Sequence, residues 1–474
     1  MVPRHLRSIS SALILLICLI SSPSRAELPW ENGNLKVTSD GRYLEHTNGT
    51  PFFWLADTAW QLFHELNQAD AELYLDNRQA KGFTVIKAVC LAEQSGDTVA
   101  NALGKYALNG APGSPNYASP KTDSGYDYWD HVDWIIQEAA ERGMYVAVLP
   151  MWGKYIVEGQ MPSSTATTYA AWVVNRLKSN PNIIWVVGGD KTPAYNYPAT
   201  SYDDRQVWKD IGNTINNNDS NHLISYHPNW QVSSSSVLHN ESWMDFNMFQ
   251  SGHDITGTIS RDAWVRVDED RAKSPAKPVV NGEPCYEHMS PNPGLASPRA
   301  EAYVTRNHFY WCVFAGALGH TYGHSAVWQM NTSSGWWYET MHWKTAVDDE
   351  GAYDMGHGID LLKSRPLAGR VPDQSIVTDA SSAWNYRRAM RGDGYLYVYS
   401  ARGNSFTVNM GKISGSSVDA WWFNPRDGKC YTSSGSQTTS PFGTYANSGT
   451  QSFDPPGGVT DDNDYILVLD DHSK

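Results

Sequence analysis

Two acidic residues, Asp190 and Glu283, stand at the ends of apolar runs, in the stretches IIWVVGGD and PVVNGEPCYE. A pair of carboxyls can hydrolyse a glycosidic bond, because one protonates the leaving oxygen while the other attacks the anomeric carbon or activates water. The proton donor needs a raised pKa, which a partly buried position beside a second carboxylate supplies. Gly188 and Gly189 let the backbone bend and keep the approach to Asp190 clear.

The pair can act only if buried strands bring both carboxyls to one cleft. Eight apolar runs are spaced along the chain, most of them continuously apolar as expected of strands buried on both faces. They are FFWLADTAW (52–60), VIKAVCL (85–91), YVAVLPMW (145–152), IIWVVGGD (183–190), LISYHP (223–228), WMDFNMFQS (243–251), PVVNGEPCYE (278–287) and GHTYG (319–323).

Helical patterns separate most of these runs, and several end at a glycine or just before a proline, which are helix stop signals. The expected helices cover residues 71–82, 128–143, 168–180, 204–217 and 300–316. The weakest part of the pattern is the short, serine-rich gap between the fifth and sixth runs.

The alternation of strands and helices predicts an α/β fold, a (β/α)8 TIM barrel over residues 27–365. The main alternative is a doubly wound open sheet, which usually carries a glycine-rich phosphate loop after its first strand. The first run here ends in ADTAW, and no GxGxxG follows it. The barrel is therefore favoured, and the fourth and seventh strands would place Asp190 and Glu283 across its mouth.

Other residues at the strand tips are candidates for substrate binding, each with a structural alternative. Asp57 could bind hydroxyls or brace the barrel, and His227 could contact substrate or hold Glu283. Lys154 could pair with an acidic sugar or be a solvated loop lysine. The remaining candidates are Gln250 for hydroxyls, and Trp152 and Trp328 as stacking platforms or packing residues. Asp190 could instead be a turn or helix-cap residue, and Glu283 a partner of an arginine or a backbone amide.

The pattern changes after residue 365, where helical periodicity disappears. Short alternating segments at 394–401, 405–410, 418–424 and 464–470 predict a small antiparallel β-sandwich domain over 366–474. A stretch rich in Ser, Thr and Gly, residues 432–451, is expected to be a long loop.

The motifs VVGGDKTP and VVNGEPCYE, with FFWLADTAW near the start, resemble the apiosidase-like barrels of glycoside hydrolase family 140. The similarity covers the chain from about Leu35 to Arg365. The tail, with DAWWFNPRDGKCY, resembles the small C-terminal domain of those proteins that is labelled collagen-binding.

This resemblance implies the (β/α)8 fold and assigns the two roles, with Asp190 as the acid/base and Glu283 as the nucleophile of a retaining glycosidase. It also implies a substrate, apiose linked to galacturonate in the pectic polysaccharide rhamnogalacturonan II, and therefore a plant cell-wall polysaccharide or oligosaccharide as partner. No cofactor and no metal are expected.

The N-terminus has the layout of a secretory signal peptide over residues 1–26, with Arg4 and Arg7 before an apolar run and Ser24-Arg25-Ala26 after it. We therefore expect a secreted or periplasmic protein with no membrane partner after signal removal. The chain carries a formal charge of −14, and the acidic balance argues against a nucleic-acid partner. Four cysteines remain in the mature chain and form no CxxC pair, although one disulfide is possible.

Two other functions stay open on the sequence. One is a glycosidase that acts on another furanoside or pentoside, such as arabinofuranosides. The other is a non-catalytic protein for carbohydrate binding or cell-wall adhesion. HExxH, GxSxG and P-loop motifs are absent, which lowers the odds of a zinc protease, a serine esterase or a nucleotide enzyme.

Overall fold

The computed structural model describes residues 27–111, 113–193, 204–254, 262–290 and 297–474. The expected signal peptide, residues 1–26, lies outside the described residues. Within the described residues, no helix combines the length and the apolar character that crossing a membrane requires. Cys90, Cys285, Cys312 and Cys430 are free thiols, so the structure forms no disulfide among them.

Each of the eight apolar runs contains a buried parallel strand, and the strands follow one another in chain order. They are β4 (Trp54–Thr58), β5 (Val85–Val89), β8 (Tyr145–Leu149), β9 (Ile183–Gly188), β10 (Ile224–His227), β11 (Asn247–Gln250), β12 (Val279–Glu283) and β13 (Gly319–Tyr322). All residues in them are buried, which explains why the runs show no polar alternation.

The hydrogen-bonded ladder is not that of a fully closed (β/α)8 barrel. Six strands form one sheet in the order β10-β9-β8-β5-β4-β13, while β11 and β12 pair separately. Single backbone bonds join the two ladders, from the Leu318 N–H to the Val279 carbonyl and from the Asp245 N–H to the Ile224 carbonyl, each at 2.9 Å. The prediction of a complete barrel is thus corrected to a curled parallel sheet of barrel type whose ladder is interrupted twice.

Helices follow most strands, as the sequence predicted. They are α1 (Leu62–Glu65), α2 (Gln68–Ala80), α3 (Tyr128–Glu141), α4 (Lys154–Val157), α5 (Ser163–Leu177), α6 (Arg205–Asn218), α8 (Ala263–Arg271), α9 (Ala302–Phe314), α10 (Trp343–Ala346) and α11 (Glu350–Lys363). The serine-rich connection between β10 and β11 forms only a short 3-10 turn, η2 (Ser234–Ser236). One of the two ladder interruptions therefore falls where the crossover helix is missing.

Two small antiparallel units accompany the parallel strands. One sheet precedes them and consists of β1 (Leu35–Val37), β2 (Leu44–His46) and β3 (Pro51–Phe52). The second is a hairpin that follows β5 and consists of β6 (Leu108–Ala111) and β7 (Ser114–Pro120).

The C-terminal region consists of antiparallel sheets. A seven-stranded sheet runs in the order β14-β15-β16-β22-β18-β19, with β20 paired to β18, and a separate ladder pairs β17 with β21. The strands are β14 (Val371–Pro372), β15 (Arg387–Gly392), β16 (Tyr395–Ser400), β17 (Phe406–Asn409), β18 (Ser417–Asn424), β19 (Lys429–Tyr431), β20 (Gly443–Ala446), β21 (Thr450–Phe453) and β22 (Tyr465–Asp471). Strand β20 and the start of β21 lie in the stretch 432–451 that we expected to be a loop, so that prediction was wrong in part.

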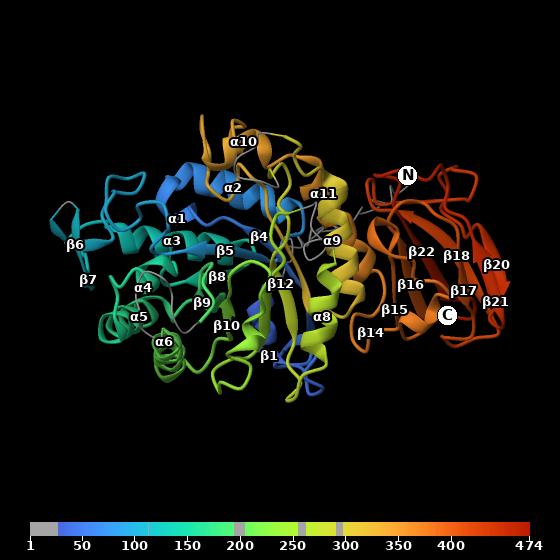
Figure 1. The fold of residues 1–474 in the computed structure, drawn as a ribbon, viewed down its shortest axis with the longest axis horizontal. Helices are drawn as coiled ribbons and strands as arrows, with labels where there is room; N and C mark the ends of the chain where they lie inside the picture. Colours follow the sequence, from blue (N-terminus) through green and yellow to red (C-terminus); the bar gives the residue numbers. More distant parts are fainter. Residues whose placement is uncertain (1–26, 112, 194–203, 255–261, 291–296) are drawn as a thin grey trace, which may run out of the picture.

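Strand β16 is buried on both faces because each face packs on a different partner. Leu396 and Val398 join the apolar core of the C-terminal sheets. Tyr397 and Tyr399 alternate with them and face helix α9, where Tyr399 stacks on Tyr310 with ring centroids 4.8 Å apart. Helix α9 thus lies between the parallel strands and the C-terminal sheet (Figure 1).

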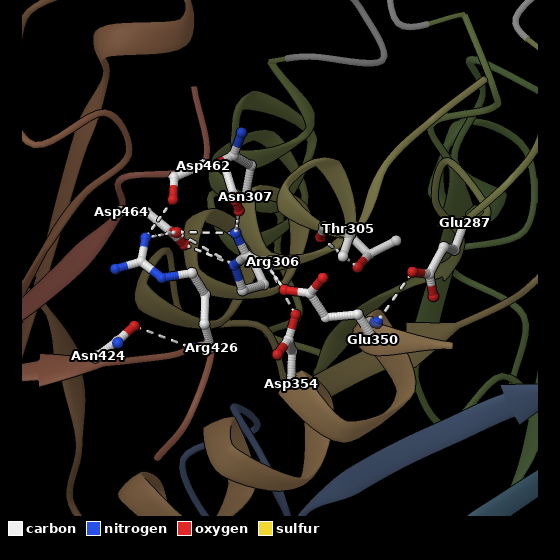
Figure 2. A network of polar contacts seen from close by, with 12 residues as sticks. Glu287, Thr305, Arg306, Asn307, Glu350, Asp354, Asn424, Arg426, Asp462 and Asp464 are labelled. Atoms are coloured by element: carbon white, nitrogen blue, oxygen red, sulfur yellow. Dashed lines mark hydrogen bonds and ion pairs between the residues drawn. The ribbon is translucent and has the colours of Figure 1, made fainter. Parts of the chain in front are cut away.

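A buried cluster of charges reinforces this junction (Figure 2). Arg306 of α9 contacts Asp354 of α11 at 2.7 Å and donates to Asp464, which precedes β22, at 3.0 Å. All three side chains are fully buried. Arg306 also donates to Asp462, so that one guanidinium binds carboxylates from both regions of the chain.

Candidate active site

Strand β9 ends in a turn whose backbone conformation few residue types permit. Gly188, Gly189 and Asp190 all have left-handed backbone, with φ angles of 100°, 106° and 52°. A β-carbon at Gly188 would collide with the His227 carbonyl oxygen, and one at Gly189 would lie 2.8 Å from the Trp152 ring. The two glycines are therefore required, and aspartate is among the few other residues that adopt this backbone conformation. The turn places Asp190 on the wall of a cavity, with 33% of its side chain exposed.

Glu283, the last residue of β12, lies on the same cavity and is held between two histidines. Its Oε2 is 3.1 Å from His227 Nε2, and its Oε1 is 3.1 Å from His253 Nε2. His227 Nε2 also lies 3.5 Å from Asp190 Oδ1. Asp190, His227 and Glu283 each present an atom within 4.8 Å of the others, so the structure brings the two predicted carboxyls together.

The surroundings of Glu283 favour its ionised form. Burial raises its pKa, but the neighbouring imidazoles of His227 and His253 lower it by more, and the net pKa is well below the ordinary value. The Tyr286 N–H donates to His253 Nδ1 at 3.4 Å, which places the ring proton of His253 on Nε2, where it faces Glu283. Glu283 is thus a carboxylate stabilised by a donor aimed at one of its oxygens.

A buried lysine that the sequence analysis missed lies behind Glu283. Lys87, in the middle of β5, donates to the carbonyl of Gly282, and its ammonium is 4.5 Å from the centroid of the Trp60 ring. Burial lowers the pKa of Lys87 to about 7, against the opposing effect of Glu283 and Asp190. The available signal was a charged residue inside the apolar run VIKAVCL, since an ammonium is costly to bury without a purpose.

The cavity between these groups has a volume of about 490 Å³. Tryptophans dominate its wall, and carboxylates supply most of its charge. The lining residues are Trp60, Glu93, Trp152, Asp190, Asn229, Trp230, Gln250, Gly252, His253, Asp254, Glu283, Tyr286, Met289, Trp328, Trp336 and Trp337. No lysine or arginine is among these described lining residues, so an anionic sugar would find no strong cation there.

Four of the six predicted substrate-binding residues lie at this site. Trp152, Gln250 and Trp328 line the cavity and are almost fully buried, so each presents only a small part of its surface to a ligand. His227 is fully buried beside the two carboxyls, and its ring contacts both Trp60 and Trp152, which also contact each other. Of its two interpretations, the structure favours holding Glu283 over contacting substrate.

The prediction that Asp57 and Lys154 bind substrate is corrected, because neither residue lines the cavity. Asp57 is fully buried and accepts from Arg78 at 2.7 Å and from the Tyr74 hydroxyl at 2.5 Å, which makes it a brace between β4 and helix α2. The ammonium of Lys154 donates a hydrogen bond to the backbone carbonyl of Glu93 and does not point into the cavity, whose lining does not include Lys154. Each residue is bound by a group from a distant part of the chain, and such a partner cannot be identified from the residue's position in the sequence.

The further residues that line the cavity come mainly from loops. His253 follows β11, Trp230 follows β10, and Trp336 and Trp337 belong to the connection between β13 and α10. Trp230 and Trp336 are 50% and 57% exposed, which is unusual for tryptophan. The tryptophan-rich composition was the only sequence signal for them, because the path of a loop cannot be read from residue types.

Asp190, His227 and Glu283 are also spaced closely enough to hold a cation, as the one such group among the residues that the structure describes. Oxygen and imidazole ligands of this kind suit several divalent metals. The expectation that no metal takes part stays a prediction.

Two family models cover most of the chain. Residues 38–368 match the model described as "Apiosidase-like, catalytic domain". The chain belongs to this apiosidase-like family. Residues 371–470 match the model described as "Putative collagen-binding domain of a collagenase". Both parts of the resemblance noted in the sequence are thereby confirmed.

Solved structures agree with the family. The apiosidase-like chain is 34% identical to a structure described as a glycoside hydrolase, with a TM-score of 0.86 over 95% of this chain and 99% of that one. It is 32% identical to a glycoside hydrolase family 5 structure from Bacteroides vulgatus, with a TM-score of 0.85 over 94% and 95%. An endo-1,4-beta-mannanase from Rhizomucor miehei shares only the fold, at 16% identity and a TM-score of 0.51 over 70% and 100%.

No curated protein matches the chain. The family model and the solved structures nevertheless agree on the class of enzyme, and the apiosidase-like protein is a glycoside hydrolase.

Proposed function

We propose that the apiosidase-like protein is a retaining glycosidase that releases apiose from apiose–galacturonate linkages of pectic rhamnogalacturonan II. The family model supports the sugar, and the carboxyl pair supports the mechanism. The observation that carries the mechanism is the placement of Asp190 and Glu283 within 4.8 Å of each other. Retaining enzymes hold their carboxyls roughly 5–5.5 Å apart, whereas inverting enzymes separate them by ~6.5–9.5 Å to admit a water molecule.

The two residues take different roles because their surroundings differ. Glu283, ionised and held by His253, attacks the anomeric carbon as the carbon–oxygen bond to the leaving group breaks. Asp190, which is partly exposed, gives its proton to the departing oxygen. Water then attacks the glycosyl-enzyme ester, Asp190 takes a proton from that water, and the sugar leaves with Glu283 regenerated.

A galacturonate leaving group sets a condition on this proposal. The described cavity wall carries Glu93, Asp190, Asp254 and Glu283 against a single histidine, so the uronate carboxylate must point away from it. The same observation favours a second candidate, a glycosidase that releases a neutral furanose such as arabinose from a neutral partner. We also propose that the protein acts outside the cytoplasm, for which residues 1–26 of the sequence are the support.

Product analysis on rhamnogalacturonan II side chains tests the proposal. The wild type should release apiose, while Asp190→Ala and Glu283→Ala should release none in the same time. Glu141→Ala, which removes an exposed carboxyl from helix α3, is the matched control and should behave as the wild type. Release of arabinose from a panel of aryl glycosides, without apiose from the pectic fragments, would establish the second candidate instead.

A further inference from the structure

The connection between β13 and α10 exposes aromatic side chains beside the active site. Trp336 is 57% exposed and Tyr338 is 55% exposed, in a 3-10 turn, η3 (Trp336–Tyr338). Large aromatic rings are usually buried or packed, because their apolar surface is costly to leave in water. Two of them exposed in one short turn need a reason.

The backbone of this turn is strained at two consecutive residues. Trp337 and Tyr338 have φ angles of 61° and 58°, in the left-handed region that residues with a bulky side chain rarely enter. Such conformations persist only where the surroundings impose them, and they concentrate at functional sites.

A buried carboxylate imposes the conformation. Glu339 is fully buried, and its Oε1 accepts from the N–H groups of Thr340 and Met341, each at 2.8 Å. Its Oε2 accepts from His288 at 3.0 Å and Arg299 at 3.2 Å, and Arg299 in turn donates to the Tyr338 carbonyl at 2.6 Å. On the other side of the turn, the Trp336 N–H donates to Gln329 Oε1 at 2.7 Å, so both flanks are fixed.

The turn also lines a hollow of its own that adjoins the catalytic cavity. Residues 334–340 line an open hollow of about 690 Å³, and Trp336 and Trp337 line both this hollow and the catalytic cavity. Trp337 packs edge-on against His253, the histidine that faces Glu283, with ring centroids 6.1 Å apart. A chain of sugars reacting at Glu283 would therefore pass onto the surface formed by Trp336 and Tyr338.

We propose that Trp336 and Tyr338 form an outer subsite that binds a neutral sugar ring of the substrate beyond the two sugars joined by the cleaved bond. The apolar C–H face of a sugar ring can stack on an aromatic ring, and the Tyr338 hydroxyl can bind a sugar hydroxyl. Among the described residues that line the hollow, Glu339 is the one charged residue, and it is buried and engaged by His288 and Arg299, so stacking rather than charge is the recognition these residues offer. This inference rests on the proposed glycosidase function and adds that oligosaccharides are preferred over simple glycosides.

Substrate length is the variable that tests the subsite. The probes are an aryl β-apiofuranoside, which occupies the reacting centre alone, and an apiose-bearing oligosaccharide cut from rhamnogalacturonan II. The variants are Trp336→Ala and Tyr338→Ala, with Trp336→Phe as the conservative variant that keeps a ring. Tyr353→Ala is the matched control, since Tyr353 is also exposed, at 47%, and lines neither cavity.

We expect kcat/KM on the oligosaccharide to fall at least tenfold further than kcat/KM on the aryl glycoside in Trp336→Ala, mainly through KM, and several-fold further in Tyr338→Ala. Trp336→Phe should recover most of the loss, and Tyr353→Ala should lose nothing on either probe. Melting temperatures and circular dichroism show whether each variant is folded.

Equal losses on the two probes, or no loss on the oligosaccharide in a folded Trp336→Ala variant, would overturn the subsite. The same outcome would leave these aromatics free to serve as a docking surface for another macromolecule. If the wild type releases another sugar, the apiose assignment fails, and the same comparison is made with short and long glycosides of that sugar. Failure of the proposed function and failure of the subsite are therefore distinguishable.

Discussion

The Arg306 cluster and the candidate active site both bury charge, and they differ in what their charges face. In the Arg306 cluster, one guanidinium is surrounded by Asp354, Asp462 and Asp464, and the cluster fills the junction between α9, α11 and the C-terminal sheet (Figure 2). At the candidate active site, Asp190 and Glu283 share His227, His253 contacts Glu283, and both carboxyls lie on the wall of an open cavity.

The difference shows that burial of charge does not by itself identify a functional site. The carboxylates of this cluster are paired with Arg306, and Asp464 also with Arg426, so these charges hold two regions of the chain together. The carboxyls of the active site are less than fully paired, and their backbone at Asp190 is strained. Incomplete pairing on a cavity wall, maintained by a required conformation, is the feature that points to chemistry.

The largest difference between the clusters should appear in activity. Glu283→Gln keeps the size of the side chain and its contacts with His253 but removes the nucleophile. We expect kcat/KM to fall at least about a thousandfold, because the amide cannot form the covalent intermediate. The melting temperature should not fall, because residues that are selected for catalysis often do not maximise stability. A folded Glu283→Gln variant that retains a tenth of the activity would remove Glu283 from the mechanism.

The opposite outcome is expected of the Arg306 cluster. Arg306→Ala leaves the buried Asp354 without its arginine and Asp464 with Arg426 alone, which should lower the free energy of unfolding by about 3–5 kcal/mol. The activity of the folded fraction should stay close to that of the wild type. Urea unfolding followed by fluorescence gives the stability, and Arg402→Ala, a part-exposed pair with Asp461, is a control that should cost far less.

Lys87 lies between the two cases, because it is buried like Arg306 but adjoins the active site. Its pKa of about 7 is below the ordinary value of 10.5, so between pH 7 and 10.5 the unfolded chain binds a proton that the folded chain does not. The stability contribution of Lys87 therefore improves as pH rises through this window and is least favourable at pH 7 and below.

Lys87→Met removes this pH dependence. We expect the stability of the variant relative to the wild type to decrease steadily from pH 7 to pH 10, and kcat/KM at pH 6 to drop about tenfold because the cation near Glu283 is lost. Unfolding curves at several pH values measure the first effect. A difference that does not vary with pH would show that Lys87 is charged throughout.

The smallest effect is expected at Lys154, which the sequence made a candidate cation for galacturonate. Because its ammonium binds the Glu93 carbonyl, Lys154→Ala should change KM for a pectic oligosaccharide by less than about twofold. A tenfold rise in KM that is absent for a neutral aryl glycoside would restore Lys154 as a substrate ligand.

The sequence predicted the parallel strands that carry the site better than the pairing between strands. Continuous apolar runs located all eight parallel strands, since burial on both faces leaves a clear pattern. Strand β20 was missed because its alternating residues are half-buried or exposed, so pairing with β18 rather than hydrophobicity defines it. The open ladder was missed as well, because hydrogen bonding between neighbouring strands leaves no mark on residue type.

The same limit applies to individual side chains. Asp190 and Glu283 were predictable because glycines and strand ends fix where they lie. Asp57 was not, since its partner Arg78 comes from the following helix and only the folded chain shows that the two meet. The turn that exposes Trp336 is stabilised by Glu339 and by Arg299, which lies far from it in the sequence, and a contact of this kind cannot be predicted from a local sequence pattern.

The stereochemistry of the first product tests the central claim most directly. Proton NMR during the first minutes of hydrolysis of an aryl β-glycoside, before the free sugar equilibrates, reports the anomeric configuration of the released sugar. With Asp190 and Glu283 within 4.8 Å of each other, we predict that the β configuration is retained. Initial release of the α anomer would mean that water attacks directly, and would contradict Glu283 as the nucleophile.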